Sequence, residues 1–355
     1  MKKRMLALAL AFAMILPLAS CGGKTNSSSV GSSSSGGTSS SGASSSAGLT
    51  VPDEVMNMVW AAGPTSGVTY PLGAAVADMI TSKLAPGAQI TLLEGTSGGN
   101  IELVNSGEAL MGHTMGDTAY CALKGLEPFD GEKTEFSTWA RVSDFQFQFV
   151  VPASLGISSF EEIKEKNIKL NLGTNTYGSS AEMCTRLVLE AYGITYDWIE
   201  ENGGSTTFTG FSDGVTLMQD GHINAWGALS AAPNSFIQEM NMSEQMTILP
   251  VSQEVMEQLA ESNGYAIGTV PANSYDGITE EIPTLISPMV LIVAADLDED
   301  FVYELTKNFF TDEMKENLLA VSTTFGNVSP EYSSQNLGAP LHPGAEKFYQ
   351  EMNVL

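Results

Sequence analysis

Three short segments rich in glycine and hydroxyl side chains each stand between an apolar stretch and a helical pattern. They are residues 63–67 (GPTSG), 95–100 (GTSGGN) and 173–180 (GTNTYGSS). Free backbone N–H groups at a helix start, together with the positive end of the helix dipole, can hold a carboxylate or a phosphate. The alternative is simple N-capping, because Ser, Thr and Asn are the preferred caps. Three such loops at equivalent places favour a shared binding site over separate caps.

These loops and a few neighbouring residues make up the predicted ligand-binding set. Arg141, in an extended stretch, can hold a ligand carboxylate through two parallel hydrogen bonds, and a surface ion pair is the alternative. Tyr70, Tyr177 and Trp226 are aromatic side chains near the loops, which either wall a ligand or pack the core. The predicted set is Thr65, Ser66, Gly67, Tyr70, Ser97, Gly98, Asn100, Arg141, Tyr177, Gly178, Ser179 and Trp226.

The second loop also contains a G-x-S-x-G pattern centred on Ser97. In α/β-hydrolases this pattern places a nucleophilic serine on a sharp turn between a strand and a helix, and His342 follows in a permissible chain order. No HGGG-like oxyanion segment accompanies it, and no single acid is marked out to orient His342. A surface serine hydrolase is therefore the alternative from a different functional class.

Metal and cofactor chemistry have no support in the residue spacing. His113 and His222 have no partner at zinc-ligand spacing, and there is no C-x-x-C. The acidic run 296–300 lacks the glycine that a calcium loop needs at its sixth position, where Phe301 stands. We predict no metal site and no cofactor.

Charge and cysteine content indicate which partners the chain can have and in which state its thiols are. The formal net charge is −26, which argues against nucleic acid as a partner. Cys121 and Cys184 are the cysteines that follow Cys21, and we expect them to be buried thiols, although an oxidising compartment would allow them to pair.

The chain around these residues alternates between strand and helix patterns. One set runs from residue 53 to an extended stretch at 138–151, and a second set follows Pro152. Repeated strand–helix units predict an α/β fold whose mostly parallel sheets are flanked by helices. We expect two lobes joined by a hinge, lobe I from 51–147 with 265–355 and lobe II from 148–264. A single long helix is predicted over Glu299–Leu319.

The first 50 residues are predicted to be a targeting signal followed by a tether. A basic start and a 15-residue apolar run, shorter than the roughly 20 residues of a membrane span, predict a signal peptide over 1–20. The run ends Leu18-Ala19-Ser20-Cys21, similar to a bacterial lipobox, so we expect lipid on Cys21. Residues 21–50 are then a lipidated cysteine and a flexible Ser/Gly tether, which holds the chain on the extracytoplasmic face of the cell membrane.

Five segments follow one another in a recognisable order over roughly residues 56–352. They are 65–73 (TSGVTYPLG), 97–109 (SGGNIEL and SGEA), 173–179 (G and GS), 221–234 (GHINA and PN) and 342–349 (HPGA and KFY). In this order they resemble the TAXI family, the extracytoplasmic solute-binding proteins of TRAP transporters. Departures from the family pattern are Thr69 for a second tyrosine, Tyr177 for serine and Asn224 for aspartate.

The resemblance implies a two-lobed, type II periplasmic-binding-protein fold that closes on a small ligand. It implies a non-enzymatic lipoprotein receptor for an organic acid or amino acid, glutamate-like or a dicarboxylate. The partners would be the membrane subunits of an ion-coupled TRAP transporter. A substrate-binding lipoprotein of an ABC importer is the alternative within the same fold.

Overall fold

The computed structural model of the chain describes residues 49–65 and 67–355. The predicted signal peptide, Cys21, nearly all of the tether and Ser66 lie outside the described residues. Every helix and strand belongs to one compact unit, Gly48–Leu355, which carries its own hydrophobic core.

The first group of elements is a parallel sheet with a helix after each strand. A helix returns the chain to the same edge each time, so β1 pairs in parallel with both β2 and β3. The strands are β1 (Asn57–Ala62), β2 (Gln89–Glu94) and β3 (Met111–Met115), and the helices are α1 (Thr69–Met79), α2 (Ser97–Asn105) and α3 (Gly116–Lys124).

The second group repeats this plan. Its strands β5 (Asn171–Thr174), β6 (Ser205–Phe208) and β7 (Ala225–Ser230) are parallel, with β5 between the other two. Strand β6 was not predicted, because its four residues have no buried alternation. The helices are α4 (Glu161–Glu165), α5 (Ser180–Ala191), α6 (Tyr196–Glu201), α7 (Phe211–Gln219) and α8 (Ser235–Ser243).

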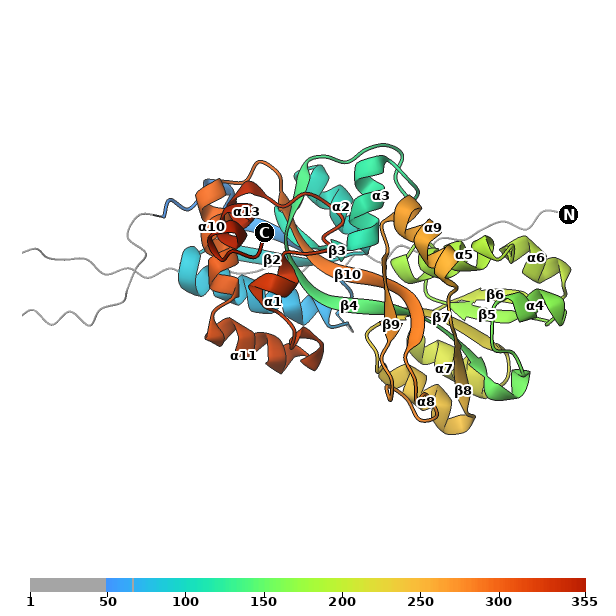
Figure 1. The fold of residues 1–355 in the computed structure, drawn as a ribbon. Coiled ribbons are helices and arrows are strands. Elements are labelled where there is room, and N and C mark those ends of the chain that lie inside the picture. Colours follow the sequence, from blue (N-terminus) through green and yellow to red (C-terminus); the bar gives the residue numbers. More distant parts are fainter. Residues whose placement is uncertain (1–48, 66) are drawn as a thin grey trace, which may run out of the picture. The chain divides into compact units, whose positions relative to one another are not determined.

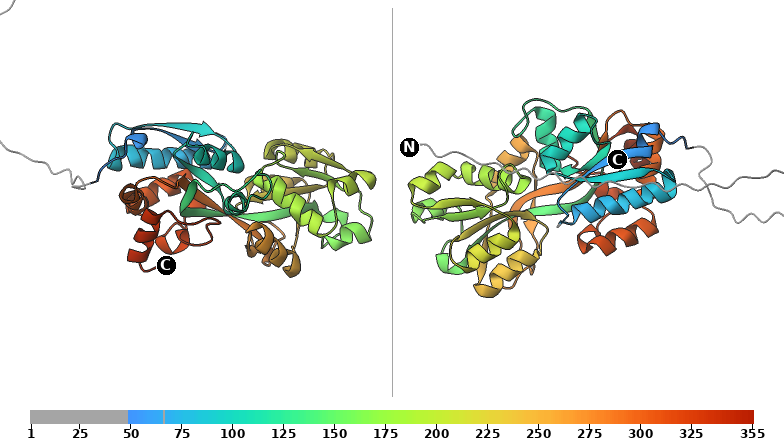
Figure 2. Two further views of the ribbon diagram at one scale, coloured as in Figure 1. Left: turned by 90° about the horizontal axis from the view of Figure 1, so that it is seen from above. Right: turned by 180° about the vertical axis from the view of Figure 1, so that it is seen from behind.

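Two long antiparallel strands run through both groups and join them into one sheet (Figures 1 and 2). They are β4 (Phe136–Pro152) and β10 (Ile282–Ala294), and the short strands β8 (Met246–Leu249) and β9 (Ala266–Val270) pair with their distal halves. The strand order is β2-β1-β3-β10-β4-β7-β5-β6. The predicted α/β fold with two lobes is confirmed, and the antiparallel pairs of β4 and β10 make the sheet mixed rather than mostly parallel.

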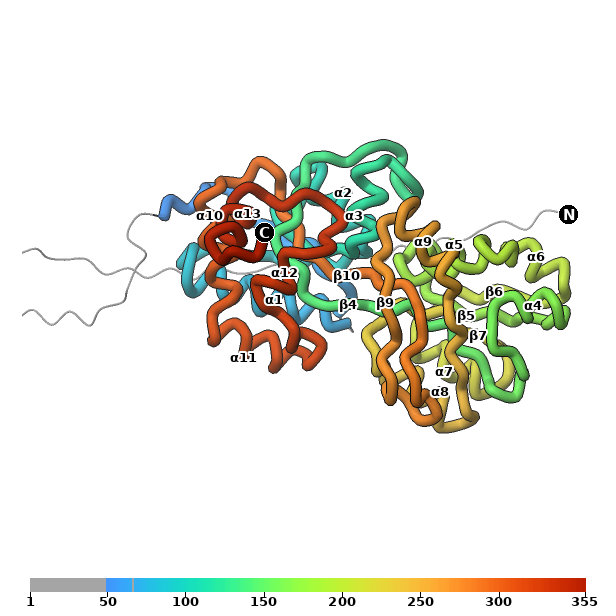
Figure 3. The backbone as a smooth tube through the Cα atoms, in the orientation of Figure 1, coloured from blue at the N-terminus to red at the C-terminus, as the bar shows by residue number. Residues whose placement is uncertain are grey.

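The remaining helices cover the sheet and complete both lobes. The backbone tube shows α9 beside α3 and α5, on one side of the crossing strands (Figure 3). The predicted long helix is wrong: it is broken after Phe310, and the Thr311 hydroxyl accepts the N–H of Met314 and starts a new helix. These helices are α9 (Gln253–Asn263), α10 (Glu299–Phe309), α11 (Asp312–Val321), α12 (Pro330–Ser333) and α13 (Pro343–Glu351).

A π-helical segment, η2 (Ile80–Leu84), continues α1, and short 3-10 helices are η1 (Asp53–Met56), η3 (Ala153–Leu155) and η4 (Thr323–Phe325). Among the helices of the described residues, none is long and apolar enough to cross a bilayer.

Candidate functional site

The register of β4 brings the carboxyl edges of the two groups together. The last residue of β3, Met115, lies opposite Met289 of β10, which in turn lies opposite Ser143 of β4. The last residue of β7, Ser230, lies opposite Gln146, three positions further along β4. Helix α3 follows β3, and α5 follows β5, whose last residue Thr174 lies opposite Gly227 of β7. Helices of the two groups therefore begin near one short stretch of β4. Carboxyl edges of this kind are where α/β proteins bind ligands.

Side chains of α3 contact lobe II near this edge: the Tyr120 hydroxyl donates to the Glu261 carbonyl of α9 at 3.1 Å, and two further contacts involve α5. The hydroxyls of Thr118, in the first turn of α3, and Ser180, at the start of α5, are 3.0 Å apart. Arg186 Nη2 lies 3.4 Å from the Glu127 carboxylate, and the same guanidinium also contacts Glu182 and Glu190. The N-terminal halves of α3 and α5 thus face one another.

The predicted residues of the first loop lie at the carboxyl end of β1. Thr65 is exposed, and its backbone N–H donates to the Glu94 carboxylate at 2.7 Å. Hydrogen bonding from the Thr65 side chain, and then from its backbone, lowers the pKa of Glu94. Gly67 and Tyr70 are half-buried at the start of α1. The N-cap of α1, Val68, offers no side-chain acceptor, so the first N–H groups of this helix lack a side-chain cap.

The second loop is tied to β3 by a buried side chain, Asn100. Asn100 is fully buried and donates through Nδ2 to the His113 carbonyl at 2.8 Å, so its first role is to tie α2 to the sheet. Its Oδ1 and the Nδ1 of His113 have no hydrogen-bond partner. Burial lowers the pKa of His113 to about 4, so this imidazole is neutral. Ser97 and Gly98 are half-buried in the first turn of α2.

N-capping accounts for part of the second and third loops. The Thr96 hydroxyl accepts the N–H of Gly99, and the Ser179 hydroxyl accepts the N–H of Glu182. The Glu182 carboxylate reaches back to the N–H of Gly178 at 2.9 Å, which completes a capping box at α5. The Ser179 hydroxyl is therefore engaged within its own helix.

Tyr177 lies at an aromatic rim of lobe II. Its side chain is 62% exposed and packs edge-to-face on Phe208, with ring centroids 5.5 Å apart. Phe208 ends β6 and also contacts Tyr196. Phe208 was not predicted as a site residue, because strand β6 was not predicted either.

Trp226 does not face a ligand space, contrary to the prediction. Its side chain is fully buried in the core of lobe II, and its ring is tilted by 46° against that of Phe211, with ring centroids 5.8 Å apart. The indole ring packs directly on two glycines. A Cβ added at Gly173 would lie 2.6 Å from the nearest ring atom, and one at Gly214 would lie 2.3 Å from it. Trp226 packs the core because β7 is covered on this face by α7.

Arg141 forms an ion pair with a carboxylate of the protein itself. Its Nε and Nη2 donate to the two carboxylate oxygens of Asp144 at 3.0 Å and 2.5 Å. The guanidinium also lies over the ring of Tyr332 in α12, 4.1 Å from the centroid. The two-pronged contact expected with a ligand is thus made with Asp144.

Comparison with protein-family models decides the membership of the chain. The model of the NMT1-like family matches residues 60–352. The chain belongs to the NMT1-like family.

Solved structures share the fold of this NMT1-like protein at low identity. PhnD1 from Prochlorococcus marinus, in complex with methylphosphonate, is 12% identical and superposes with a TM-score of 0.51 over 85% of this chain and 99% of its own. A TctC solute binding protein from Polaromonas, with no ligand, is 16% identical, with a TM-score of 0.50 over 86% and 100%. At these identities the likeness shows the fold alone.

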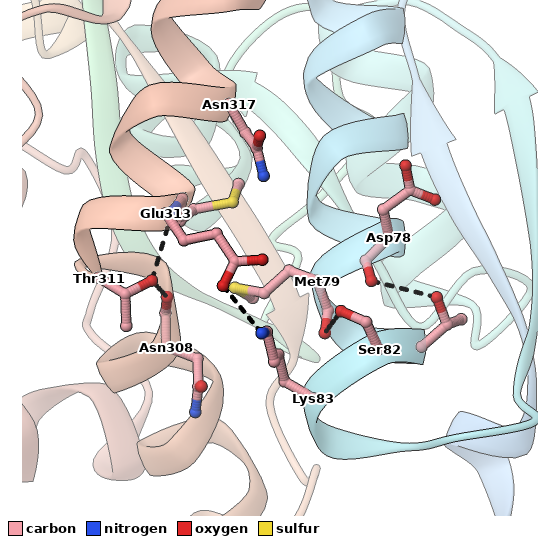
Figure 4. A pocket seen from close by; sticks show the side chains of 10 residues that line it. Asp78, Met79, Ser82, Lys83, Asn308, Thr311, Glu313 and Asn317 are labelled. Atoms are coloured by element: carbon pink, nitrogen blue, oxygen red, sulfur yellow. Dashed lines mark hydrogen bonds and ion pairs between the residues drawn. The ribbon is translucent and has the colours of Figure 1, made fainter. Parts of the chain in front are cut away.

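Two hollows of the NMT1-like protein lie beside α1 and beside α2. One, of about 550 Å³, lies between α1 with η2 and α11, where Lys83 pairs with Glu313 at 2.8 Å (Figure 4). Another, of about 570 Å³, runs along the outer side of α2 and includes Gly95, Thr96 and three glutamates. Neither hollow is lined by any residue of the predicted ligand-binding set.

The geometry does not supply a Ser97–His342 pair. His342 is buried at the start of α13, and its Nδ1 accepts the N–H of Gly344 at 3.2 Å. This bond leaves the ring proton on Nε2, which has no partner. A general base in a serine hydrolase must instead offer a free nitrogen to the serine hydroxyl.

The described cysteines are two free thiols, as predicted: Cys121 and Cys184 are both buried and unpaired.

Three residues at the facing edge were not in the predicted set. Thr118 and its neighbour Asp117 begin α3 directly after the buried strand β3, and Ser180 begins α5. The signal available in the sequence was a Gly-Asp-Thr triplet after an apolar segment. This triplet has the same small, polar character as the three loops that were singled out.

Proposed function

We propose that this NMT1-like protein is an extracytoplasmic solute-binding receptor without enzymatic activity. Its solute is a small organic acid or amino acid, glutamate-like or a dicarboxylate, held between lobe I (51–147 with 265–355) and lobe II (148–264). The observation that carries the proposal is the convergence of helix starts from both lobes at one stretch of β4, with Thr118 and Ser180 in contact. The fold shared with two solute-binding proteins supports it.

Charge pairing within the protein bears on how an acidic solute would be held. Arg141 and Arg186 both pair with carboxylates of the chain. Donors for an acidic group would then come mainly from backbone N–H groups at the helix starts and from hydroxyls, which bind anions without a formal cation. Trp226 and Arg141 leave the predicted set, and its other residues, Ser66 included, remain our proposal for the residues that line the site.

Lipid on Cys21 and delivery to a TRAP-type transporter complete the proposal. Both rest on the sequence: the lipobox ending at Cys21 and the similarity of residues 56–352 to TAXI receptors. A lipid-held receptor on the extracytoplasmic face would keep its captured solute close to the permease.

A solute panel tests the receptor function directly. Residues 49–355, which hold the entire described unit, are purified and heated with organic acids, amino acids and ester substrates. A solute at 100 times its Kd adds about 2.7 kcal/mol to the free energy of unfolding, which raises Tm by about 5 °C in a domain of this size. We expect such a rise for an acidic solute and no ester turnover. Ester turnover that disappears in Ser97→Ala would establish the hydrolase instead.

Ser97→Ala is expected to weaken binding of the solute found in this panel by about 3- to 10-fold, the worth of one hydroxyl hydrogen bond. Calorimetry measures the change. Ser106→Ala, at the other end of α2, is the matched control and is expected to leave the affinity unchanged. Equal affinity in Ser97→Ala and wild type would remove Ser97 from the site.

A further inference from the structure

The contact between Thr118 and Ser180 joins the positive ends of two helices. Helices α3 and α5 have nine and twelve residues, long enough for aligned peptide dipoles to leave partial positive charge at each start. Two such ends repel one another unless a negative charge lies between or beside them. Thr118 is 2% exposed, so solvent screens this place poorly.

The negative charge available there is the side chain of Asp117. It is fully buried in the first turn of α3, and its carboxylate accepts the hydroxyl of Ser287 on β10 and, at 3.5 Å, that of its neighbour Thr118. In the described part of the chain no lysine or arginine pairs with it, and its charge is stabilised by Ser287, by the backbone of α3 and by the nearby Tyr265 hydroxyl. Burial outweighs them and raises the pKa of Asp117 to about 6.

The other groups that face Asp117 are neutral at physiological pH. Cys121 lies one turn further along α3 and Cys184 on α5, and burial raises the pKa of both thiols. Tyr265, just before β9, is 3% exposed, and burial also raises its pKa. The Tyr265 hydroxyl lies close enough to the Asp117 carboxyl to influence its pKa, yet it makes no hydrogen bond of standard geometry. A buried hydroxyl without a hydrogen-bond partner, next to the contact between Thr118 and Ser180, indicates a place where a ligand could supply the missing partner.

An anion bound between Thr118 and Ser180 would therefore meet the Asp117 carboxylate. Two negative charges a few ångströms apart in a buried place do not both persist, and one of the two groups takes a proton. A solute carboxylate that receives both helix dipoles is the better stabilised of the two, so the proton goes to Asp117.

We propose that the anionic group of the solute binds between Thr118 and Ser180, replacing their mutual hydrogen bond, while Asp117 takes up one proton from solvent. This inference rests on the proposed receptor function and adds to it a new subsite and a proton linkage. Affinity for an acidic solute is then constant below pH 6 and falls about tenfold per pH unit well above it.

Calorimetry tests the linkage with succinate and L-glutamate as probes of residues 49–355. Titrations at pH 7.5 in phosphate and in Tris, whose ionisation enthalpies differ, count the protons taken up. We expect about one proton per solute bound to wild type, and a Kd that rises about tenfold from pH 7 to pH 8. In Asp117→Asn we expect no proton uptake and a Kd independent of pH. Asp78→Asn, an exposed carboxyl on α1, is the matched control and retains both effects.

A second variant keeps the test decisive if Asp117→Asn does not fold. Ser287→Ala removes a hydrogen bond that favours the charged carboxylate, so the midpoint of the pH profile moves upward. Binding without proton uptake, or with the same pH profile in Ser287→Ala as in wild type, overturns the linkage and leaves the receptor function standing. If neither probe binds wild type anywhere between pH 5.5 and 8, the acidic solute class and the linkage fall together.

Discussion

Replacing Trp226 by alanine is expected to lower the free energy of unfolding by about 3–5 kcal/mol, the usual cost of emptying a large aromatic site in a core. The side chain is fully buried and fills the volume between Gly173 of β5 and Gly214 of α7. Urea unfolding of residues 49–355 measures the change. In a protein of this size the loss corresponds to a fall in Tm of about 10 °C.

A double-mutant cycle with Gly214 tests whether the loss of stability in Trp226→Ala comes from the packing of the indole ring on this glycine. A Cβ at position 214 would stand 2.3 Å from the indole ring, so Gly214→Ala destabilises the wild-type protein. In the Trp226→Ala background the ring is gone, the methyl group occupies part of the cavity, and alanine is the better helix former by about 1 kcal/mol. Gly214→Ala should therefore stabilise that variant. The same sign in both backgrounds would contradict this packing.

Trp226→Phe separates core packing from ligand binding. Phenylalanine keeps most of the apolar volume, so we expect a smaller loss of stability and an unchanged affinity for the solute. A tenfold loss of affinity in a folded Trp226→Phe protein would restore Trp226 to the binding site.

Replacing Cys21 by alanine is expected to move the full-length protein almost completely from the membrane fraction to the soluble fraction. Each buried methylene of an acyl chain contributes about 0.8 kcal/mol to membrane attachment, and two or more chains hold a protein stably. Without the thiol no lipid is attached. Fractionation after growth with a radiolabelled fatty acid measures location and label together.

Ser27→Ala, in the tether, is the matched control for this experiment and is expected to stay labelled and membrane-bound. Wild-type protein that carries no label, or Cys21→Ala protein that sediments with the membranes, would contradict the anchor. The solute panel is unaffected by either outcome, because it uses residues 49–355.

Local patterns were enough to predict the class of fold and the edge where the loops gather. Val59, Trp60 and Ala61 lie in an apolar run that ends at glycine and is followed by a helical pattern, and this unit recurs along the chain. Each unit predicts its own strand, turn and helix from neighbours in sequence. The break between α10 and α11 at Phe310 was not predicted, because the apolar periodicity of α10 continues into α11.

The assignment of roles within the site depended on contacts between distant residues. Asn100 and Arg141 look equally available in the sequence, but one is tied to His113 and the other is paired with Asp144. Trp226 stands near a predicted loop, yet the face of β7 on which it lies is covered by α7. Which side of a strand is covered follows from how the helices cross, and spacing along the chain does not contain that information.

Composition and spacing were enough to predict an acidic chain of alternating strands and helices, while the signal peptide, the lipid on Cys21 and the anion-binding loops stay predictions. Those properties arise from composition and from residues a few positions apart. Only the tertiary structure brought Thr118 and Ser180, 62 residues apart, into contact and buried Asp117 beside them. The register of β4 between the two groups of strands decides that meeting, because it aligns the helix starts of both lobes, and a buried charge acquires its properties from whatever surrounds it.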